Sequence, residues 1–161
     1  MGSYRSVGVV SSTFRKKVFR FYLAGGGNDG AIMFIRFFSG EIDEFSHVSA
    51  GLFSTAYKLL DDEVLPDYEY CALMEPMRWF DLHLKAPFDY RLKPASLADR
   101  SICWFRSTAH EHLAKAWEMV AILEARDIFI WTVRCDQPGY VIYEDAVQVL
   151  AYPFPDVRRL L

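Results

Sequence analysis

The residues best suited to chemistry stand at the ends of two apolar runs. Arg106 ends the run at 101–106 and Arg134 ends the run at 128–134, with a helical pattern between them. A strand, a helix and a second strand within about 34 residues are typical of a βαβ unit, whose strands are parallel and whose crossover is right-handed. Ligands bind such units at the carboxyl ends of the strands, beside the first turn of the helix.

Five residues should therefore meet at one edge of the predicted sheet: Arg106, Ser107, Thr108, His110 and Arg134. Two guanidinium groups, the free N–H groups of a helix start and an imidazole suit phosphate or a carboxylate. The sequence thus predicts an anion-binding site made of these residues. The alternative is that Arg106 and Arg134 are surface charges that pair with Glu144 or Asp145.

No residue is assigned a catalytic role, and neither a metal nor a cofactor is expected. In the run His110-Glu111-His112 the histidines are two residues apart, so a helix would point them to different sides. The wider spacing of a HExxH zinc motif is absent. No CxxC pair occurs, so we expect reduced thiols at the three cysteines: Cys71, Cys103 and Cys135. Cys135, which follows Arg134 and precedes a Pro-Gly turn, is the cysteine expected to be exposed near a cation.

A second pattern spans most of the chain. Arg20 lies in an early apolar run, Ser54-Thr55 lies in the first half, and Glu144 lies near a late hairpin. This order resembles the Arg…Ser-Thr-Ser…Glu order of ADP-ribosyltransferases. The resemblance implies an enzyme in which Arg20 and Ser54 hold a dinucleotide and Glu144 stabilises a developing sugar cation. The chain departs from the family pattern at Ala56, which replaces the last serine, and no second glutamate completes a Glu-x-Glu pair.

An α+β fold with a mixed β-sheet is expected to position these residues. An N-terminal hairpin is predicted from the apolar runs 17–23 and 31–38, with the glycine-rich loop 25–30 between them. A short helix is predicted over 54–60, and an acidic loop follows at 61–63.

The second half of the chain has a clearer pattern. A central helix is predicted over 66–84, because Leu73, Met77 and Phe80 recur on one face at 3.6 residues per turn. Pro76 removes a helical hydrogen bond, so either one kinked helix or two short helices should form. A C-terminal β-α-β-β unit then comprises the strand 101–106, a helix begun by a Thr108/Glu111 capping box, the strand 128–134, and a hairpin of 140–143 with 146–151.

The whole chain, 1–161, is expected to form one domain, with 1–14 and 155–161 poorly ordered. It has 18 Lys and Arg against 21 Asp and Glu, a net charge of −3, so no nucleic-acid partner is expected. No apolar run approaches the roughly 18 residues of a membrane helix. The N-terminus also lacks a secretory signal, so we expect no membrane contact and a cytoplasmic location.

The leading functional hypothesis is a soluble protein-interaction or regulatory binding module, because aromatic residues make up 16% of the chain. Its partner would be another protein or a second copy paired at a sheet edge. Some aromatic side chains should then be exposed, among them Tyr68, Trp79, Trp104 and Tyr152.

The alternative is a protein or enzyme that binds a small phosphate- or nucleotide-bearing ligand at Arg106, His110 and Arg134. Two geometries separate these hypotheses. A small-ligand protein should bring the three residues together in a concave pocket. An interaction module should instead carry a flat apolar patch, with the arginines apart or paired.

Overall fold

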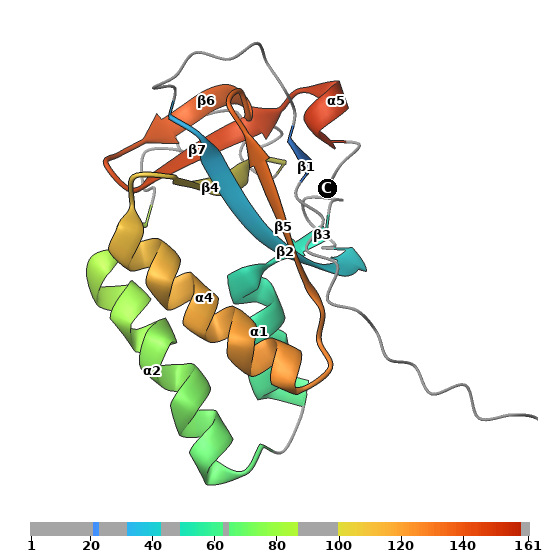
Figure 1. Ribbon diagram of the computed structural model, residues 1–161, viewed down its shortest axis with the longest axis vertical. Helices are drawn as coiled ribbons and strands as arrows, with labels where there is room; N and C mark the ends of the chain where they lie inside the picture. The colour runs from blue at the N-terminus through green and yellow to red at the C-terminus, as the bar shows by residue number, and fades with distance from the viewer. Residues whose placement is uncertain (1–20, 23–31, 43–48, 63–64, 87–99, 159–161) are drawn as a thin grey trace, which may run out of the picture.

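The computed structural model describes residues 21–22, 32–42, 49–62, 65–86 and 100–158. They form an α+β fold around one twisted sheet, as the sequence predicts (Figure 1). The strands follow the order β1-β5-β2-β4-β7-β6, and β3 also pairs with β2. Their bounds are β1 Phe21–Tyr22, β2 Phe34–Ile42, β3 Ser49–Gly51, β4 Ile102–Arg106, β5 Ile130–Cys135, β6 Gly139–Glu144 and β7 Gln148–Pro153.

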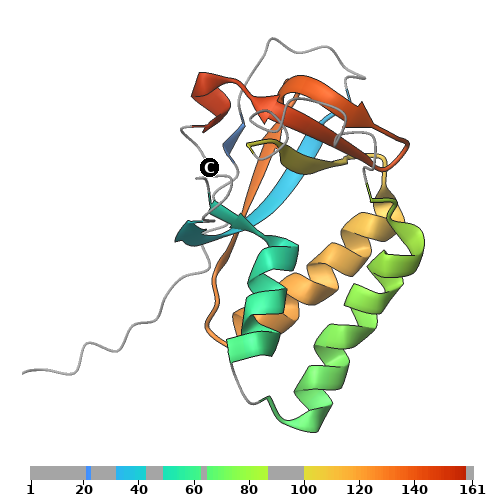
Figure 2. The same ribbon diagram turned by 180° about the vertical axis from the view of Figure 1, so that it is seen from behind.

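Three helices cover one face of the sheet, namely α1 (Leu52–Asp62), α2 (Asp67–His83) and α4 (His110–Ala125). The helices α2 and α4 lie side by side in both views and are antiparallel (Figures 1 and 2). Two ion pairs join them: Glu69 at the start of α2 binds Arg126 just after α4, and Glu75 of α2 binds Lys115 of α4. A short helix, α5 (Pro155–Arg158), contributes Val157 to the cluster on the opposite face. None of the helices in the described ranges is long and apolar enough to cross a membrane.

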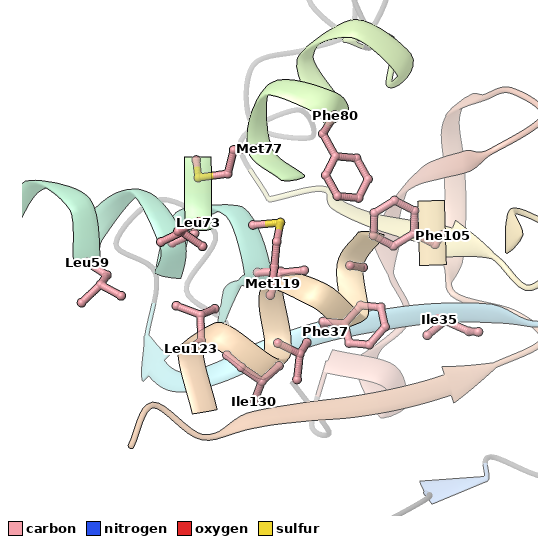
Figure 3. Close-up of a cluster of buried hydrophobic side chains, with 14 residues drawn as sticks. Ile35, Phe37, Leu59, Leu73, Met77, Phe80, Phe105, Met119, Leu123 and Ile130 are labelled. Atoms are coloured by element: carbon pink, nitrogen blue, oxygen red, sulfur yellow. The ribbon is translucent and has the colours of Figure 1, made fainter. Parts of the chain in front are cut away.

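The strand β2 supplies both hydrophobic clusters through the two-residue period of a strand. Ile35 and Phe37 belong to the larger cluster, which the three helices cover (Figure 3). Phe34 and Phe38 lie on the other face, with Trp104 and Val133. Because both faces of this strand are buried, its sequence reads as an almost continuous apolar run rather than as an alternation.

The helix α2 continues through Pro76 as one helix rather than two. Leu73, Met77 and Phe80 are buried on the predicted face, and the proline ring is buried beside them. Packing of this face against α4 therefore offsets the hydrogen bond that the proline removes. Tyr70, which has the same phase, is exposed.

The predicted βαβ unit is present in a split form. Both β4 and β5 are antiparallel to β2, so they run in the same direction, as expected. However, β2 lies between them, and the two strands do not pair with each other. The long strand β2 carries backbone hydrogen-bonding groups along both of its edges, and it pairs with β5 along one edge and with β4 along the other.

The predicted N-terminal hairpin is wrong for the part that can be tested. The strand β1 pairs in parallel with β5, with Phe21 opposite Val133, so β5 separates β1 from β2. The rest of the predicted first strand and the glycine-rich loop lie outside the described residues. Local alternation indicated two strands correctly, but it carried no information about which strand each would meet.

Helix boundaries also differ from the prediction. The helix α4 begins at His110 with Ala109 at the N-cap and no side-chain cap, so the predicted Thr108/Glu111 capping box is not formed. The helix α1 is longer than expected at both ends and includes the first two acidic residues of the predicted 61–63 loop. Residues 155–158 form the short helix α5, whereas 1–14 and 159–161 lie outside the described residues, so the expectation of poor order at the two ends stays a prediction.

The predicted C-terminal hairpin is confirmed, since β6 and β7 pair antiparallel. Gly139 opens β6 opposite Pro153, with a φ of +150°. A Cβ at this position would lie 1.9 Å from the carbonyl oxygen of Tyr152, which is well inside van der Waals contact. Glycine is therefore required here both by the backbone angle and by the approach of β7.

Gly139→Ala should lower the free energy of unfolding by at least about 2 kcal/mol, because strain and a backbone clash add together. Urea denaturation followed by circular dichroism measures the change. The matched control is Gly40→Ala, since a Cβ at Gly40 meets nothing within 4 Å. Equal stabilities of the two variants would contradict this account of β6.

Candidate ligand-binding cleft

A cleft of about 810 Å³ opens between the sheet, the start of α1 and the end of α2. Its lining comes from β2, the β3–α1 junction, the last turn of α2 and the residues after it, β4, and Gln148 of β7. On β4 both Ile102 and Cys103 line it, although neighbouring residues of a strand point to opposite faces. The cleft therefore follows the edge of β4 as well as one face of the sheet.

The cleft lies where one edge of β2 changes its neighbour. The strand β4 pairs with β2 at Phe34 and Ile35, and β3 pairs with it from Phe38 onward. Within the described strands, no residue of β3 or β4 is paired with Arg36 or Phe37 on that edge. Helix α1 follows β3 directly and leaves the sheet at this point (Figure 2). The divergence of β3 and β4 creates the space.

Four phenylalanine rings form an apolar wall of the cleft. Phe53 of α1 and Phe80 of α2 meet edge to face, with ring centroids 4.9 Å apart. Phe80 lies 5.9 Å from Phe105 of β4, and Phe105 lies 6.3 Å from Phe37 of β2. The close-up of the larger cluster shows Phe37, Phe80 and Phe105 side by side (Figure 3). A wall of this kind favours an apolar, ring-shaped or chain-like group.

Arg36 brings a buried positive charge to the cleft. Only 9% of the residue is exposed, and its Nη2 donates a hydrogen bond of 2.8 Å to the carbonyl oxygen of Ser49. Its guanidinium reaches the start of α1, because Nη2 lies 3.8 Å from the point that a Cβ at Gly51 would occupy. An arginine is seldom buried to this degree without a polar role. The structure thus places a cation beside an apolar wall.

Gln148 fixes one side of the cleft. This buried side chain donates from Nε2 to the carbonyl oxygen of Lys85 at 2.6 Å, and to Oδ2 of Asp145 at 3.3 Å. The first bond joins β7 to the chain just after α2, across 63 residues of sequence. The second ties the glutamine to the turn between β6 and β7. The position of the α2 end therefore depends on that turn.

Asp145 holds the turn with its carboxylate. Burial works against the charge, but hydrogen bonds from the N–H groups of Val147 and Gln148 and from the Tyr143 hydroxyl outweigh it. The pKa of Asp145 is consequently lowered from its ordinary value. A charged side chain at this turn thus orients Gln148 toward the cleft.

Cys103 is exposed and lines the cleft. Protein nevertheless surrounds the thiol closely enough that burial raises its pKa to about 11, against the opposing effect of the Arg36 charge. The thiol therefore stays protonated at neutral pH and is a poor nucleophile. Cys135, which was expected to be exposed, is buried in the second cluster, and burial raises its pKa to about 12.

His83 lines the cleft at the end of α2. Its ring stacks on Trp79 at 4.3 Å, and its Nδ1 lies 2.7 Å from the carbonyl oxygen of that residue. A carbonyl accepts hydrogen bonds, so Nδ1 carries the proton, and the neutral ring has its acceptor at Nε2. His112 of α4 contacts the same turn through a bond of 3.0 Å from Nε2 to the His83 carbonyl.

The predicted anion site is not assembled as expected. Arg106 lies opposite Phe34 of β2, whereas Arg134 lies opposite Ile35. Cross-strand partners share a face and successive residues alternate, so the two arginines point to opposite faces of the sheet.

The remaining members of that site have other contacts. Arg106 binds the Glu144 carboxylate at 2.6 Å and the Asp145 carbonyl at 2.7 Å, which is the pairing named as the alternative. The hydroxyl of Ser107 accepts the N–H of Met33. Thr108 and His110 are exposed at the start of α4. Anion binding at this edge stays a prediction.

The residues of the ADP-ribosyltransferase pattern have contacts of other kinds in the structure. Ser54 lies in the cleft on α1, and the Thr55 hydroxyl donates to the Gly51 carbonyl. Glu144 of β6 forms an ion pair with Arg106 of β4. Arg20 lies outside the described residues. In the described part of the chain, no three His, Cys, Asp or Glu side chains are grouped as metal ligands would be.

The sequence held one signal for the cleft that periodicity does not capture. Arg36 interrupts the apolar run Phe34–Phe38, in which both faces are buried. A buried charge in such a run costs free energy unless the fold supplies partners that pair with it or accept hydrogen bonds from it. Gln148, Cys103 and the four phenylalanines carry no comparable mark in the sequence.

Asp145→Asn should make stability less dependent on acid. The folded protein keeps this carboxyl ionised to a lower pH than the unfolded chain does, so the wild type should lose stability as the pH falls through and below about 4. Urea midpoints measured from neutral to acid pH should therefore fall less steeply in Asp145→Asn. The exposed Asp61→Asn serves as the control, and parallel acid profiles for wild type and Asp145→Asn would contradict the assigned role.

Comparison of the chain with protein-family models, with curated proteins and with solved structures finds no match. What the cleft can bind is therefore inferred from its geometry and from the chemistry of its lining.

Proposed function

We propose that the protein binds a small amphipathic molecule in the cleft between β3, β4, the start of α1 and the end of α2. The observation that carries this proposal is the cleft itself, whose volume of about 810 Å³ suits a small molecule. Ligand sites combine an apolar lining with a few placed polar groups. The phenylalanine wall supplies the first, and Arg36, Gln148 and Ser54 supply the second.

Binding, rather than covalent chemistry at the thiol, is the use that the lining favours. The raised pKa of Cys103 keeps its sulfur protonated at neutral pH. Gln148 is held by two hydrogen bonds, so its side of the cleft is formed before any ligand arrives. A preformed site loses less conformational entropy on binding.

The variant Cys103→Trp should block the cleft, because a large ring would replace a small side chain that faces it. The fluorescent probe 8-anilinonaphthalene-1-sulfonate, which is apolar with one anionic group, should bind wild type saturably at one site. Its affinity should fall at least about tenfold in Cys103→Trp. A fluorescence titration measures this.

The matched control is Cys71→Trp, since Cys71 is also exposed but lies on α2 and does not line the cleft. Circular dichroism and thermal unfolding show whether each variant is folded. Equal probe affinity in wild type and both folded variants would place the probe elsewhere and contradict the proposed function.

A second candidate function, an interaction module, is favoured by one observation. Among the described strands β6 pairs only with β7, and its Tyr140 and Val141 are 66% and 52% exposed. An uncovered strand edge with apolar side chains can pair with another chain. Of the aromatic residues expected at the surface, Tyr68 is exposed, whereas Trp104 is buried.

If β6 pairs with the same strand of a second copy, Val141→Lys should prevent it, because lysine on an edge strand opposes such pairing. Light scattering coupled to gel filtration should then give a dimer mass for wild type and a monomer mass for the variant. Tyr68→Lys, an exposed position on α2, is the control that should stay dimeric. A monomeric wild type at high micromolar concentration would contradict this candidate.

A further inference from the structure

We infer that the molecule bound in the cleft carries a neutral carbonyl group beside an apolar body, and that the indole N–H of Trp104 donates a hydrogen bond to the carbonyl oxygen. The inference rests on the proposed function and narrows it to a ligand class. It follows from the burial of Trp104, from its place in the sheet and from the chemistry of the indole.

The indole of Trp104 is a buried donor that lacks an acceptor. Only 1% of the residue is exposed, and its Nε1 has no hydrogen-bond partner among the described residues. A buried N–H group left unpaired costs free energy comparable to a lost hydrogen bond, and most buried polar groups in proteins are therefore paired. Because Trp104 also lines the cleft, a molecule bound there is a source of the acceptor.

Trp104 lies where β4 separates from β2. Arg106 and Phe105 pair with β2, whereas Trp104, the next residue along this edge, is paired only with Val149 of β7 among the described strands. The three residues of β4 from Ile102 to Trp104 all line the cleft. The cleft therefore reaches the indole at the point where the sheet opens.

Phe105 brings the apolar wall to the same point. Successive residues of a strand point to opposite faces, so Phe105 packs with Phe37 and Phe80 under the helices, whereas Trp104 belongs to the cluster on the other face. A ligand that crosses the edge of β4 would pack its apolar body against the phenylalanine rings and bring its polar end to the indole.

The chemistry of the indole selects a carbonyl group. An indole donates one hydrogen bond through Nε1 and accepts none, so the ligand has to supply an acceptor. A carbonyl oxygen accepts without adding a donor, whereas a hydroxyl group would bring an O–H that needs a partner of its own. Trp104 is uncharged, so this contact requires no charge on the ligand.

The test compares three neutral probes that share a phenyl group: acetophenone, 1-phenylethanol, and isopropenylbenzene, in which a methylene group replaces the ketone oxygen. NMR titrations give the affinity of each probe for wild type, Trp104→Phe and Trp131→Phe. The ratio of ketone affinity to alkene affinity should fall roughly three- to tenfold in Trp104→Phe, because the hydrogen bond is lost while the cost of taking each probe out of water is unchanged. Trp131→Phe, on β5 and outside the cleft lining, should keep the wild-type ratio.

The indole N–H resonance of Trp104 in wild type tests the contact directly, also where Trp104→Phe does not fold. The chain has four tryptophans, so replacing the other three by phenylalanine one at a time identifies the signal of Trp104. Acetophenone should move this signal to lower field than isopropenylbenzene does, since the two probes carry the same ring and differ in the acceptor.

Each outcome decides between the inference and the proposed function. An equal ketone-to-alkene ratio in wild type and folded Trp104→Phe, with Cys103→Trp still blocking both probes, would overturn the inference and leave the proposed function intact. An indole signal already at a hydrogen-bonded position without probe, and unmoved by acetophenone, would do the same, since water or the chain would then supply the acceptor. Tighter binding of 1-phenylethanol than of acetophenone would overturn the carbonyl assignment. Probe binding unaffected by Cys103→Trp would overturn the proposed function itself.

Discussion

The pairing of β2 on both of its edges is the constraint on which the rest of the molecule depends. One edge is taken by β5 over six successive residue pairs, and the other is shared between β4 and β3. Because the strand is covered on both faces, its alternate residues supply the inner side chains of two separate clusters. The three helices can cover one face only because Ile35 and Phe37 present an apolar surface to them. The change of neighbour along the second edge then leaves the space that becomes the cleft.

Local pattern predicted much of the secondary structure but little of the pairing. The apolar face of α2 follows from residues three and four apart, and the β6–β7 hairpin follows from two short runs around a turn. These contacts are between near neighbours in sequence. The insertion of β2 between β4 and β5 joins segments far apart, and hydrophobic alternation is the same whichever strand is the partner. The hairpin expected at the N-terminus failed for this reason, since Phe21 meets β5 instead.

The insertion of β2 between β4 and β5 also explains why the predicted anion site differs from the structure. The anion site was predicted for two adjacent parallel strands, whose ends would bring Arg106 and Arg134 to one edge. With β2 between them, the two arginines are one register position apart and point to opposite faces. Arg106 then pairs with Glu144 and supports the β6–β7 turn, so it has a structural role. Arg36 was open to inference from its place in an apolar run, but the other residues that line the cleft come from five further elements that no short motif connects.

The bond from Gln148 to the Lys85 carbonyl has a consequence for how the cleft forms. It closes a loop of 63 residues, and the cleft also needs β2, the start of α1 and β4 in place. Contacts between residues so distant in sequence cost more chain entropy to form and are typically completed late in folding. The cleft should therefore exist only in the fully folded chain, and partly folded forms should lack it. A ligand held there would raise the stability of the whole domain by mass action, and its binding would report that folding is complete.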